Sequence, residues 1–521
     1  MPETIALSID GRDVEAERGI TVAAALENAG PTACRVSVTG SRRGALCGMG
    51  VCFECRVTID GAPHRRACME MVKAGMAIVT GESQVSGLRS PVRGTETVDC
   101  EVAVIGGGPA GVAAACQAAE RGAATVLLDE GLVPGGQIHR HLPSAPSPAA
   151  ARRWLDRLAC SGAAVRTESA VFDIEREASG FRIAAESPKG TLLVHARRLI
   201  LATGARELFL PFPGWTLPGV MGAGGAQALW KSGASFAGRR AAVAGSGPLL
   251  LPVAASLSKA GAAVEFVAEQ ASLPSLARFG AALALSPRRI LDAAAYRRAF
   301  SGTPYRMGTW IAEAEGREKL EYVVLTDGRG RFRVDCDLAA VSFGLVPNVE
   351  LARLLGCEVR GGAVVVGDGQ ATSVGDVFAA GEPCGVAGVE VAIAEGELAG
   401  VAAAARGSLP ASEARRLART RSRGRRLAAV MNRAFRPRKD LVALARKDTI
   451  VCRCEDVPYG RIAACAGLRE AKLSTRAGMG PCQGRVCGPA LAFLFGWESD
   501  TVRPPVKPAT LGNLVAMEES T

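Results

Sequence analysis

The sequence predicts an α/β protein with two dinucleotide-binding domains, an N-terminal α+β domain and a small C-terminal helical domain. A strand, a glycine-rich turn, a helix and a second strand follow one another twice, over residues 96–130 and again from about Arg239. A group of four cysteines lies towards each end of the chain. With 521 residues, of which 48% are hydrophobic and 22% charged, the chain is long enough for several buried cores.

The N-terminal domain is expected to be rich in strands. The stretch TIALSID alternates towards Asp10–Gly11, which is a hairpin signal, and residues 20–29 have helical spacing. Four cysteines follow with the spacing C-x4-C-x2-C-x12-C, a pattern typical of plant-type ferredoxins: Cys47, Cys52, Cys55 and Cys68. The pattern favours a [2Fe–2S] cluster, and a structural zinc ion is the alternative.

The first glycine-rich turn follows the strand DCEVAVI. Its glycines Gly106, Gly108 and Gly111 suit a tight turn, a close approach of a pyrophosphate, and packing of the helix on the strand. The helix N-terminus would then face the phosphates. Asp129 ends the second strand, where an acidic side chain can bind ribose hydroxyl groups.

Three later features resemble the two-dinucleotide-domain flavoproteins, which include thioredoxin reductase and glutathione reductase. They are a Gly-Gly-Gln turn, an Ala-Thr-Gly turn after a strand, and a late Gly-Glu pair before an alanine-rich helix; the residues are Gly136, Gln137, Thr203, Gly204, Gly381 and Glu382. The resemblance implies FAD at the first site, with Glu382 in a place where the family usually has Asp. A fold that binds only NAD, or another adenine nucleotide, is the alternative.

The second glycine-rich turn departs from the pattern. Gly245 and Gly247 are present, but Leu250 stands where a third glycine is expected, and its side chain would hinder close packing of helix on strand. Glu269 either serves a ribose or is a surface residue at a strand end. We therefore expect a degenerate second site, which either binds NAD(P) or is silent. Neither glycine turn is followed by the CxxC pair of a disulfide reductase.

The C-terminal cysteines form two short pairs. Cys452-x-Cys454 is followed by Cys482-x4-Cys487 within VCRCEDV and GMGPCQGRVCGP. These residues can hold one [2Fe–2S] cluster or one zinc ion. The C-x-C spacing resembles the bacterioferritin-associated ferredoxin (BFD)-like [2Fe–2S] module, which implies a second cluster here.

The order of these modules, with the phrases FPGWTLPGVM and GSGPLLLPVAA, resembles the α subunits of opine oxidases, hydrogen cyanide synthase and bacterial proline and hydroxyproline dehydrogenases. The resemblance implies an FAD-dependent oxidoreductase acting on CH–NH donors within a multisubunit complex. The implied partner is a D-amino-acid-oxidase-like β subunit with its own FAD, and the implied acceptor is a quinone or an electron carrier. No residue is predicted to be a proton-transfer catalyst, and Arg206 is either a group near the flavin or a solvent-exposed charge.

The order of strands, glycine turns, helices and cysteine groups along the chain sets the expected domain boundaries. We expect a plant-type ferredoxin-like domain, the first part of an FAD domain, a second NAD(P)-type domain, the second part of the FAD domain, a basic linker helix and a BFD-like domain: 1–95, 96–215, 216–342, 343–405, 406–447 and 448–521. Two other functions stay open, a self-contained NAD(P)H-dependent reductase and a zinc-stabilised scaffold.

The net charge of +11 comes from one segment. Residues 406–447 contain 14 basic and two acidic residues, so the rest of the chain is nearly neutral. No nucleic-acid motif accompanies this segment, and we expect no nucleic-acid partner. The segment is either a solvated helix or a docking element for an acidic face of a partner. The N-terminus lacks a signal pattern, and we expect a cytoplasmic protein that is not integral to the membrane, with association with its inner face as an alternative.

Overall fold

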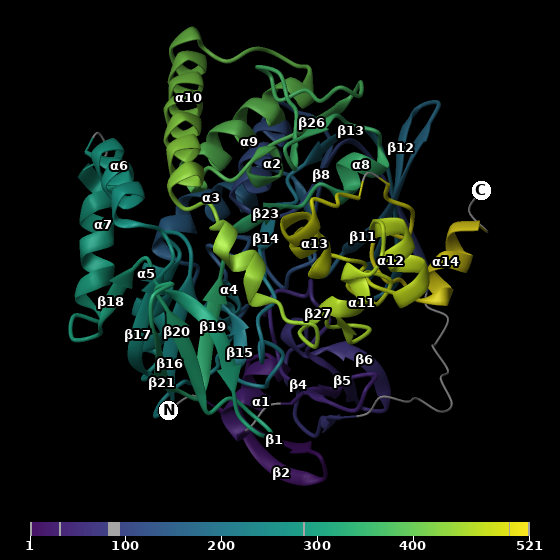
Figure 1. Ribbon diagram of the computed structural model, residues 1–521. Coiled ribbons are helices and arrows are strands. Elements are labelled where there is room, and N and C mark those ends of the chain that lie inside the picture. The colour runs from purple at the N-terminus through teal and green to yellow at the C-terminus, as the bar shows by residue number, and fades with distance from the viewer. Residues whose placement is uncertain (1–2, 31–32, 82–93, 285–286, 500, 519–521) are drawn as a thin grey trace. The chain divides into compact units, whose positions relative to one another are not determined.

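The structure, a computed structural model, describes residues 3–30, 33–81, 94–284, 287–499 and 501–518 (Figure 1). The chain forms two compact units. The first unit, called unit 1 below, comprises Met1–Leu88, Glu207–Leu345 and Val430–Ser499. The second, unit 2, comprises Arg89–Arg206, Val346–Ala429 and Asp500–Thr521. The chain passes between the units in β14 (Ala205–Glu207) and again in β23 (Leu345–Pro347).

The N-terminal part of unit 1 is a five-stranded sheet with the order β2-β1-β7-β5-β6. The predicted hairpin is confirmed, since β1 and β2 pair antiparallel on either side of Asp10–Gly11. Helix α1 begins after Thr21, whose hydroxyl accepts a hydrogen bond from the Ala24 amide and caps it. The elements are β1 (Thr4–Ile9), β2 (Arg12–Glu17), α1 (Val22–Ala29), β3 (Arg35–Val36), β4 (Arg42–Arg43), β5 (Arg56–Ile59), β6 (Ala62–Arg66), η1 (Ala67–Met69) and β7 (Ala77–Val79).

The central part of unit 1 is a parallel sheet, β15-β22-β16-β17-β18, with a three-stranded antiparallel sheet, β19-β20-β21. Strands β15, β22 and β16 are short apolar runs that are almost entirely buried, as expected for strands covered on both faces, whereas β18 is largely exposed. The elements are β15 (Val220–Gly222), α4 (Ala223–Lys231), β16 (Arg240–Gly245), α5 (Leu250–Lys259), β17 (Ala263–Glu269), α6 (Leu273–Leu283), α7 (Pro287–Arg298), β18 (Tyr305–Met307), β19 (Trp310–Glu315), β20 (Tyr322–Thr326), β21 (Arg331–Asp335) and β22 (Leu338–Ser342).

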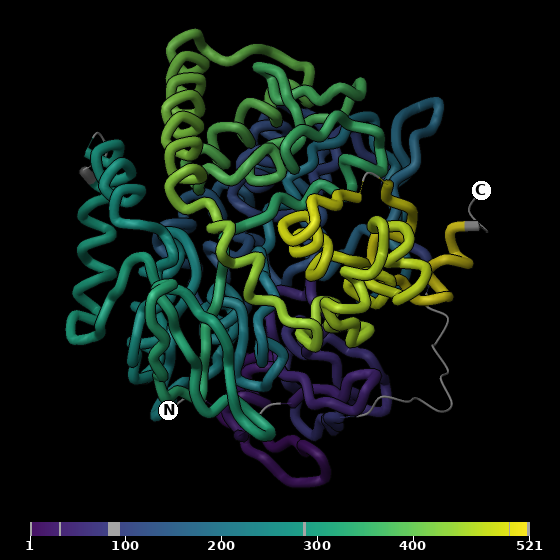
Figure 2. Tube along the Cα trace, in the orientation of Figure 1, coloured from purple at the N-terminus to yellow at the C-terminus, as the bar shows by residue number. Residues whose placement is uncertain are grey.

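The C-terminal part of unit 1 is small and mainly helical. Figure 2 shows its yellow-green tube beside the purple N-terminal segment, and hydrogen bonds join the two. Its elements are η3 (Lys439–Leu444), β27 (Ile450–Cys452), β28 (Val457–Pro458), α11 (Tyr459–Ala463), α12 (Leu468–Thr475) and α13 (Cys487–Phe495).

Unit 2 is built on a seven-stranded sheet with the order β10-β9-β8-β13-β12-β11, in which β26 also pairs with β13. Helices α2 and α9 pack together, and glycines allow the close approach: a Cβ at Gly396 would lie 2.1 Å from the Ala110 carbonyl oxygen. The elements are β8 (Gly94–Ile105), α2 (Pro109–Ala119), β9 (Thr125–Leu128), α3 (Ala149–Cys160), β10 (Ala164–Arg166), β11 (Ala170–Glu177), β12 (Gly180–Ser187), β13 (Gly190–Leu201), α8 (Glu350–Leu354), β24 (Val359–Arg360), β25 (Ala363–Val364), β26 (Val377–Ala379), η2 (Glu382–Cys384), α9 (Val389–Ala404) and α14 (Leu511–Glu518).

The basic segment contains one long helix, α10 (Ala411–Ala434), most of which belongs to unit 2. Among the described residues, no helix combines the length and the apolar character needed to cross a membrane. The strand–turn–helix–strand plan is found in both units, so the predicted α/β fold class is confirmed, whereas the six domain boundaries stay a prediction.

Candidate functional site

The first glycine turn lies between β8 and α2 in unit 2. Gly106 has φ +107°, and a Cβ there would lie 2.3 Å from the Ala202 carbonyl oxygen. A Cβ at Gly111 would lie 1.8 Å from the Gly106 carbonyl oxygen. Only glycine fits at these two positions, because the turn, the neighbouring strand end and the first turn of α2 are in direct contact. Gly108 is the residue directly before α2, so the helix N-terminus opens at this turn.

Asp129 follows the end of β9 and lies against this turn. Its carboxylate accepts hydrogen bonds from the amides of Gly107 and Gly131, the second at 2.6 Å. Burial raises its pKa. The loop with Gly136 also runs along the turn, since a Cβ at Gly136 would lie 2.9 Å from the Gly108 Cα. Gln137 is exposed at the end of this loop and accepts a hydrogen bond from Arg140.

Thr203 and Gly204 lie just beyond the C-terminal end of β13. The Thr203 hydroxyl donates to the Asn348 carbonyl oxygen at 2.6 Å, and the Asn348 side-chain amide donates to the Thr203 carbonyl oxygen at 2.8 Å. Arg206 is only 8% exposed, donates to Asn348 Oδ1 at 2.6 Å and pairs with Glu350 at 2.9 Å. The expectation of a solvent-exposed charge at Arg206 is therefore wrong. Asn348 was missed, although a polar residue directly after a strand end is a usable signal.

The late Gly-Glu pair is held by two residues that the sequence did not single out. The Gly381 amide donates to Glu395 Oε2 at 3.0 Å. Arg425 of α10 binds both oxygens of Glu395, at 2.8 and 2.7 Å, and also donates to the carbonyl oxygens of Cys384 and Gly385. Glu382 is half-buried, and burial raises its pKa. Part of the basic segment thus fixes this loop within unit 2 and is not simply solvated.

The four N-terminal cysteines are all buried, between 1% and 3% exposed. Hydrogen bonds join them in two pairs, Cys47 with Cys52 and Cys55 with Cys68. Backbone amides point at the sulfur atoms: Met49 and Cys52 donate to Cys47 at 3.4 Å, Gly50 donates to Cys68 at 3.2 Å, and Glu54 donates to Cys52 at 3.4 Å.

The environment of Cys47 favours a thiolate. Burial opposes ionisation, but hydrogen bonds from the Cys52 thiol and from backbone amides outweigh it and lower the pKa of Cys47 to about 6. Gly48, at φ +61°, lets the loop approach α4, since a Cβ there would lie 2.8 Å from the Gly225 carbonyl oxygen. The loop therefore surrounds the sulfur atoms with amide donors, as an iron–sulfur centre requires.

The four C-terminal cysteines are also buried and also form two pairs. Cys452 lies with Cys487 and Cys454 with Cys482. The hydrogen bond from Cys487 lowers the pKa of Cys452 to about 7, helped by the Gly478 amide at 3.5 Å, while burial acts in the other direction. Gly480 allows the two cysteine segments to meet, because a Cβ there would lie 2.3 Å from the Cys454 Cβ. Cys465, a fifth cysteine of this module, is only half-buried.

The pairing of the thiols fits a two-iron centre. A [2Fe–2S] cluster takes two thiolates on each of its irons, whereas a structural zinc ion gathers all four ligands round one point. The paired arrangement in each quartet is the one that a [2Fe–2S] cluster would take.

In the second glycine turn, in unit 1, the acidic residue binds its own turn as Asp129 does in the first. Glu269 at the end of β17 is fully buried and accepts hydrogen bonds from the amides of Gly247 at 2.8 Å and Ala271 at 2.7 Å. Burial raises the pKa of Glu269 to about 7. The expectation that Glu269 is a surface residue at a strand end is therefore wrong. Leu250 is fully buried in the first turn of α5, where a third glycine was expected.

The segment after α10 occupies the mouth of this second turn. Ser246, between the two turn glycines, donates to the Phe435 carbonyl oxygen at 2.7 Å. Gln270, directly after β17, donates to the Arg436 carbonyl oxygen at 3.2 Å and accepts from the Arg438 amide at 3.2 Å. These are the positions at which a Rossmann-type domain meets pyrophosphate and ribose. The chain itself therefore makes the polar contacts that a bound dinucleotide would need.

Comparisons with known proteins agree with this description. The family model for pyridine nucleotide-disulphide oxidoreductases matches residues 100–396, and the model for a 2Fe-2S iron-sulfur cluster binding domain matches residues 2–83. The A-type subunit of opine oxidase from Rhizobium meliloti is 31% identical over 460 residues, which cover 80% of this chain and 98% of the relative. The HcnB subunit of hydrogen cyanide synthase from Pseudomonas aeruginosa is 36% identical over 449 residues, 77% of this chain and 92% of the relative.

Among solved structures, L-proline dehydrogenase from P. horikoshii shares the fold, with a TM-score of 0.72, 21% identity and 98% of each chain covered. The predicted resemblance to opine oxidase and hydrogen cyanide synthase subunits is confirmed, as is the presence of a [2Fe–2S] domain. The chain thus belongs to the pyridine nucleotide-disulphide oxidoreductase family, as an FAD-dependent oxidoreductase with a [2Fe–2S] domain, homologous to subunits of multisubunit oxidase complexes.

Proposed function

We propose that this chain is the α-type electron-transfer subunit of an amino acid, imino acid or opine dehydrogenase or oxidase complex. Its electrons come from a D-amino-acid-oxidase-like β subunit, and they leave to a quinone or an electron carrier. The names of the relatives, subunits of an opine oxidase and of hydrogen cyanide synthase, support this proposal. We place the complex in the cytoplasm, with no nucleic-acid partner.

The proposal assigns a role to each predicted site residue. In unit 2, the glycine turn, Asp129, the Gly-Gly-Gln loop, the Thr-Gly turn and the late Gly-Glu pair hold FAD. In unit 1, each cysteine quartet holds a [2Fe–2S] cluster. FAD, when bound, exchanges electrons in pairs or singly, and the protein sets its position and potential. The metal ligands are Cys47, Cys52, Cys55 and Cys68, with Cys452, Cys454, Cys482 and Cys487 for the second cluster.

One observation carries the proposal. Six of the eight cysteines, including all four of the C-terminal quartet, belong to a single buried hydrophobic cluster of unit 1, together with Trp215 and Phe209. Each quartet is arranged as two thiol pairs. Two one-electron centres in one buried hydrophobic core are what an electron-transfer subunit needs, and a zinc-stabilised scaffold does not require them.

The rival function, a self-contained NAD(P)H-dependent reductase, needs an open second dinucleotide site. The contacts of Ser246 and Gln270 with residues 435–438 oppose this function, since the same polar groups cannot also bind a dinucleotide. We therefore propose that the second domain is retained for its structure.

The test is the cofactor content and reactivity of the purified full-length chain. We expect about four iron atoms and four acid-labile sulfides per chain, from two [2Fe–2S] centres with cysteine ligands only, one FAD, and no bleaching of the flavin by NADH. Cys482→Ser is expected to remove half of the iron, and Cys465→Ser, a half-buried cysteine of the same module, to remove none. Zinc without sulfide, or flavin reduction by NADH at a catalytic rate, contradicts the proposal.

A further inference from the structure

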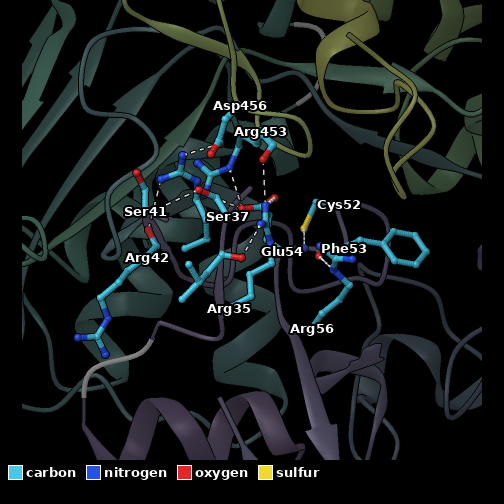
Figure 3. A network of polar contacts seen from close by, with 12 residues as sticks. Arg35, Ser37, Ser41, Arg42, Cys52, Phe53, Glu54, Arg56, Arg453 and Asp456 are labelled. Atoms are coloured by element: carbon cyan, nitrogen blue, oxygen red, sulfur yellow. Dashed lines mark hydrogen bonds and ion pairs between the residues drawn. The ribbon is translucent and has the colours of Figure 1, made fainter. Parts of the chain in front are cut away.

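A buried ion pair joins the two cysteine quartets. Glu54 lies between the predicted ligands Cys52 and Cys55, and Arg453 lies between Cys452 and Cys454. Arg453 Nε donates to Glu54 Oε2 at 3.0 Å, although the two residues are 399 positions apart in the sequence. Figure 3 shows Glu54 and Arg453 pointing towards each other beside Cys52. The two ligand loops therefore meet through the residues at their centres.

Further contacts fix this pair on both sides. Arg35 Nη2 donates to Glu54 Oε1 at 2.7 Å and to the Arg453 carbonyl oxygen at 3.0 Å. Arg453 Nη1 donates to the Trp215 carbonyl oxygen at 2.8 Å, and its guanidinium lies over the Trp215 ring, 4.8 Å from the centroid. Both carboxylate oxygens are thus bound, and neither Glu54 nor Arg453 is more than 2% exposed.

Adhesion alone does not explain this pair. A buried ion pair costs so much desolvation that well-packed apolar residues usually hold two surfaces together at least as well. What the pair adds is a defined geometry, because its donors and acceptors meet in one orientation only. In addition, the interface has a second ion pair of opposite polarity, Arg43 with Asp456 at 2.7 Å, which already joins the two modules.

We propose that Glu54 and Arg453 are positioning residues, which hold the two cluster-binding loops in contact so that single electrons exchange directly between the two cysteine quartets. This inference rests on the proposed function, because it needs a cluster in each quartet. In each exchange one site loses one electron and the other gains it, with no bond broken and no proton moved. The N-terminal and C-terminal modules would then act as one electron-transfer device within unit 1.

The test is electron paramagnetic resonance of the full-length protein reduced with dithionite. In the wild type, two reduced centres held in contact are expected to give signals that are split or broadened by spin–spin interaction. Glu54→Gln leaves Arg35 and Arg453 facing each other without the carboxylate, so the two loops are expected to lose their fixed arrangement and the spin–spin interaction to weaken towards the sum of two isolated centres. Arg453→Gln is expected to act in the same direction.

Arg43→Gln is the matched control. It breaks another buried ion pair between the same two modules, Arg43 with Asp456 at 2.7 Å, a distance equal to that of the Arg35–Glu54 contact. Arg43 and Asp456 both lie outside the two short stretches between predicted ligands that contain Glu54 and Arg453. Arg43→Gln is expected to keep the spin–spin interaction, and iron content per chain shows that each variant retains both clusters. The inference is overturned if Glu54→Gln keeps its full iron content and an unchanged spin–spin interaction. It is also overturned if the wild type shows the signals of two isolated centres. A wild type with only one iron–sulfur signal contradicts the proposed function instead.

Discussion

At the scale of single residues, a buried carboxyl group binds each of the two glycine turns. Asp129 and Glu269 end equivalent strands, and each accepts one hydrogen bond from an amide of its own turn and one from the amide two residues further along the chain. The sequence located both residues, because an acidic side chain at the end of a second strand is a local pattern. It could not show that Glu269 is fully buried, because that depends on segments far away in the chain.

Glu269 gives the protein a predictable dependence of stability on pH. Its pKa is about 7 in the folded chain, against 4.5 for an ordinary glutamate. The folded state therefore binds the proton more tightly, so the stabilisation is complete below about pH 4.5 and is lost as the pH rises towards 7 and above. The full loss amounts to about 3 kcal/mol by linkage, of which about 2 kcal/mol falls between pH 5.5 and pH 8. Urea denaturation of the full-length chain at these two pH values measures that part.

Glu269→Gln is the comparison for this pH effect, since the amide keeps one acceptor oxygen and does not titrate. We expect the difference in free energy of unfolding between pH 5.5 and pH 8 to shrink in this variant. The same difference in wild type and Glu269→Gln would mean that another group is responsible.

At the scale of elements, the basic segment shows which features sequence patterns can predict and which they cannot. Its composition predicts a helix, and α10 is that helix. The pattern does not reveal that Arg425 binds Glu395, or that residues 435–438 lie in the second glycine turn. These contacts join residues 30 to 189 positions apart, so they leave no trace in local spacing.

Removing the contacts of this segment is expected to open the second turn. In Phe435→Gly combined with Arg438→Gly, the edge-to-face contact of Phe435 with Phe279 and the stacking of Arg438 on Trp310 are lost. The segment then holds the site less tightly, and the affinity for NADH should rise at least about fivefold, roughly 1 kcal/mol. Quenching of tryptophan fluorescence by NADH measures this affinity.

Arg446→Gly serves as the control for the opened site, because Arg446 pairs with Glu313 outside the turn. Equal NADH affinity in the wild type and the double variant would show that the segment does not block the turn.

At the scale of the whole molecule, the sequence predicted the module order, both cysteine quartets and both glycine turns. It did so because these features are short motifs with fixed spacing. It did not predict that the first and last modules share one core, or that Glu54 and Arg453 meet. Acidic and basic residues between cysteines look like ordinary surface charges until the fold brings them together.

Loss of iron is expected to weaken unit 1 and to spare unit 2. The clusters would bind folded unit 1 only, so their removal takes away that stabilisation. It also leaves the buried cysteine thiols without the iron that they would bind. Hydrogen exchange after treatment with a chelator and ferricyanide should rise in the cysteine loops and their neighbours, with little change in β8, α2 and α9. An equal rise in hydrogen exchange in both units would contradict the prediction that only unit 1 is weakened.

The pairing of Glu54 with Arg453 also has a consequence for biosynthesis. A ribosome that adds about 5–20 residues per second needs roughly 20 to 80 s to travel from codon 54 to codon 453. During that interval the nascent N-terminal loop has no guanidinium from Arg453 to cover it, so Cys52 and Cys55 stay open to the machinery that delivers iron and sulfide. Once the C-terminal module is complete, Arg453 binds Glu54 and covers the N-terminal loop.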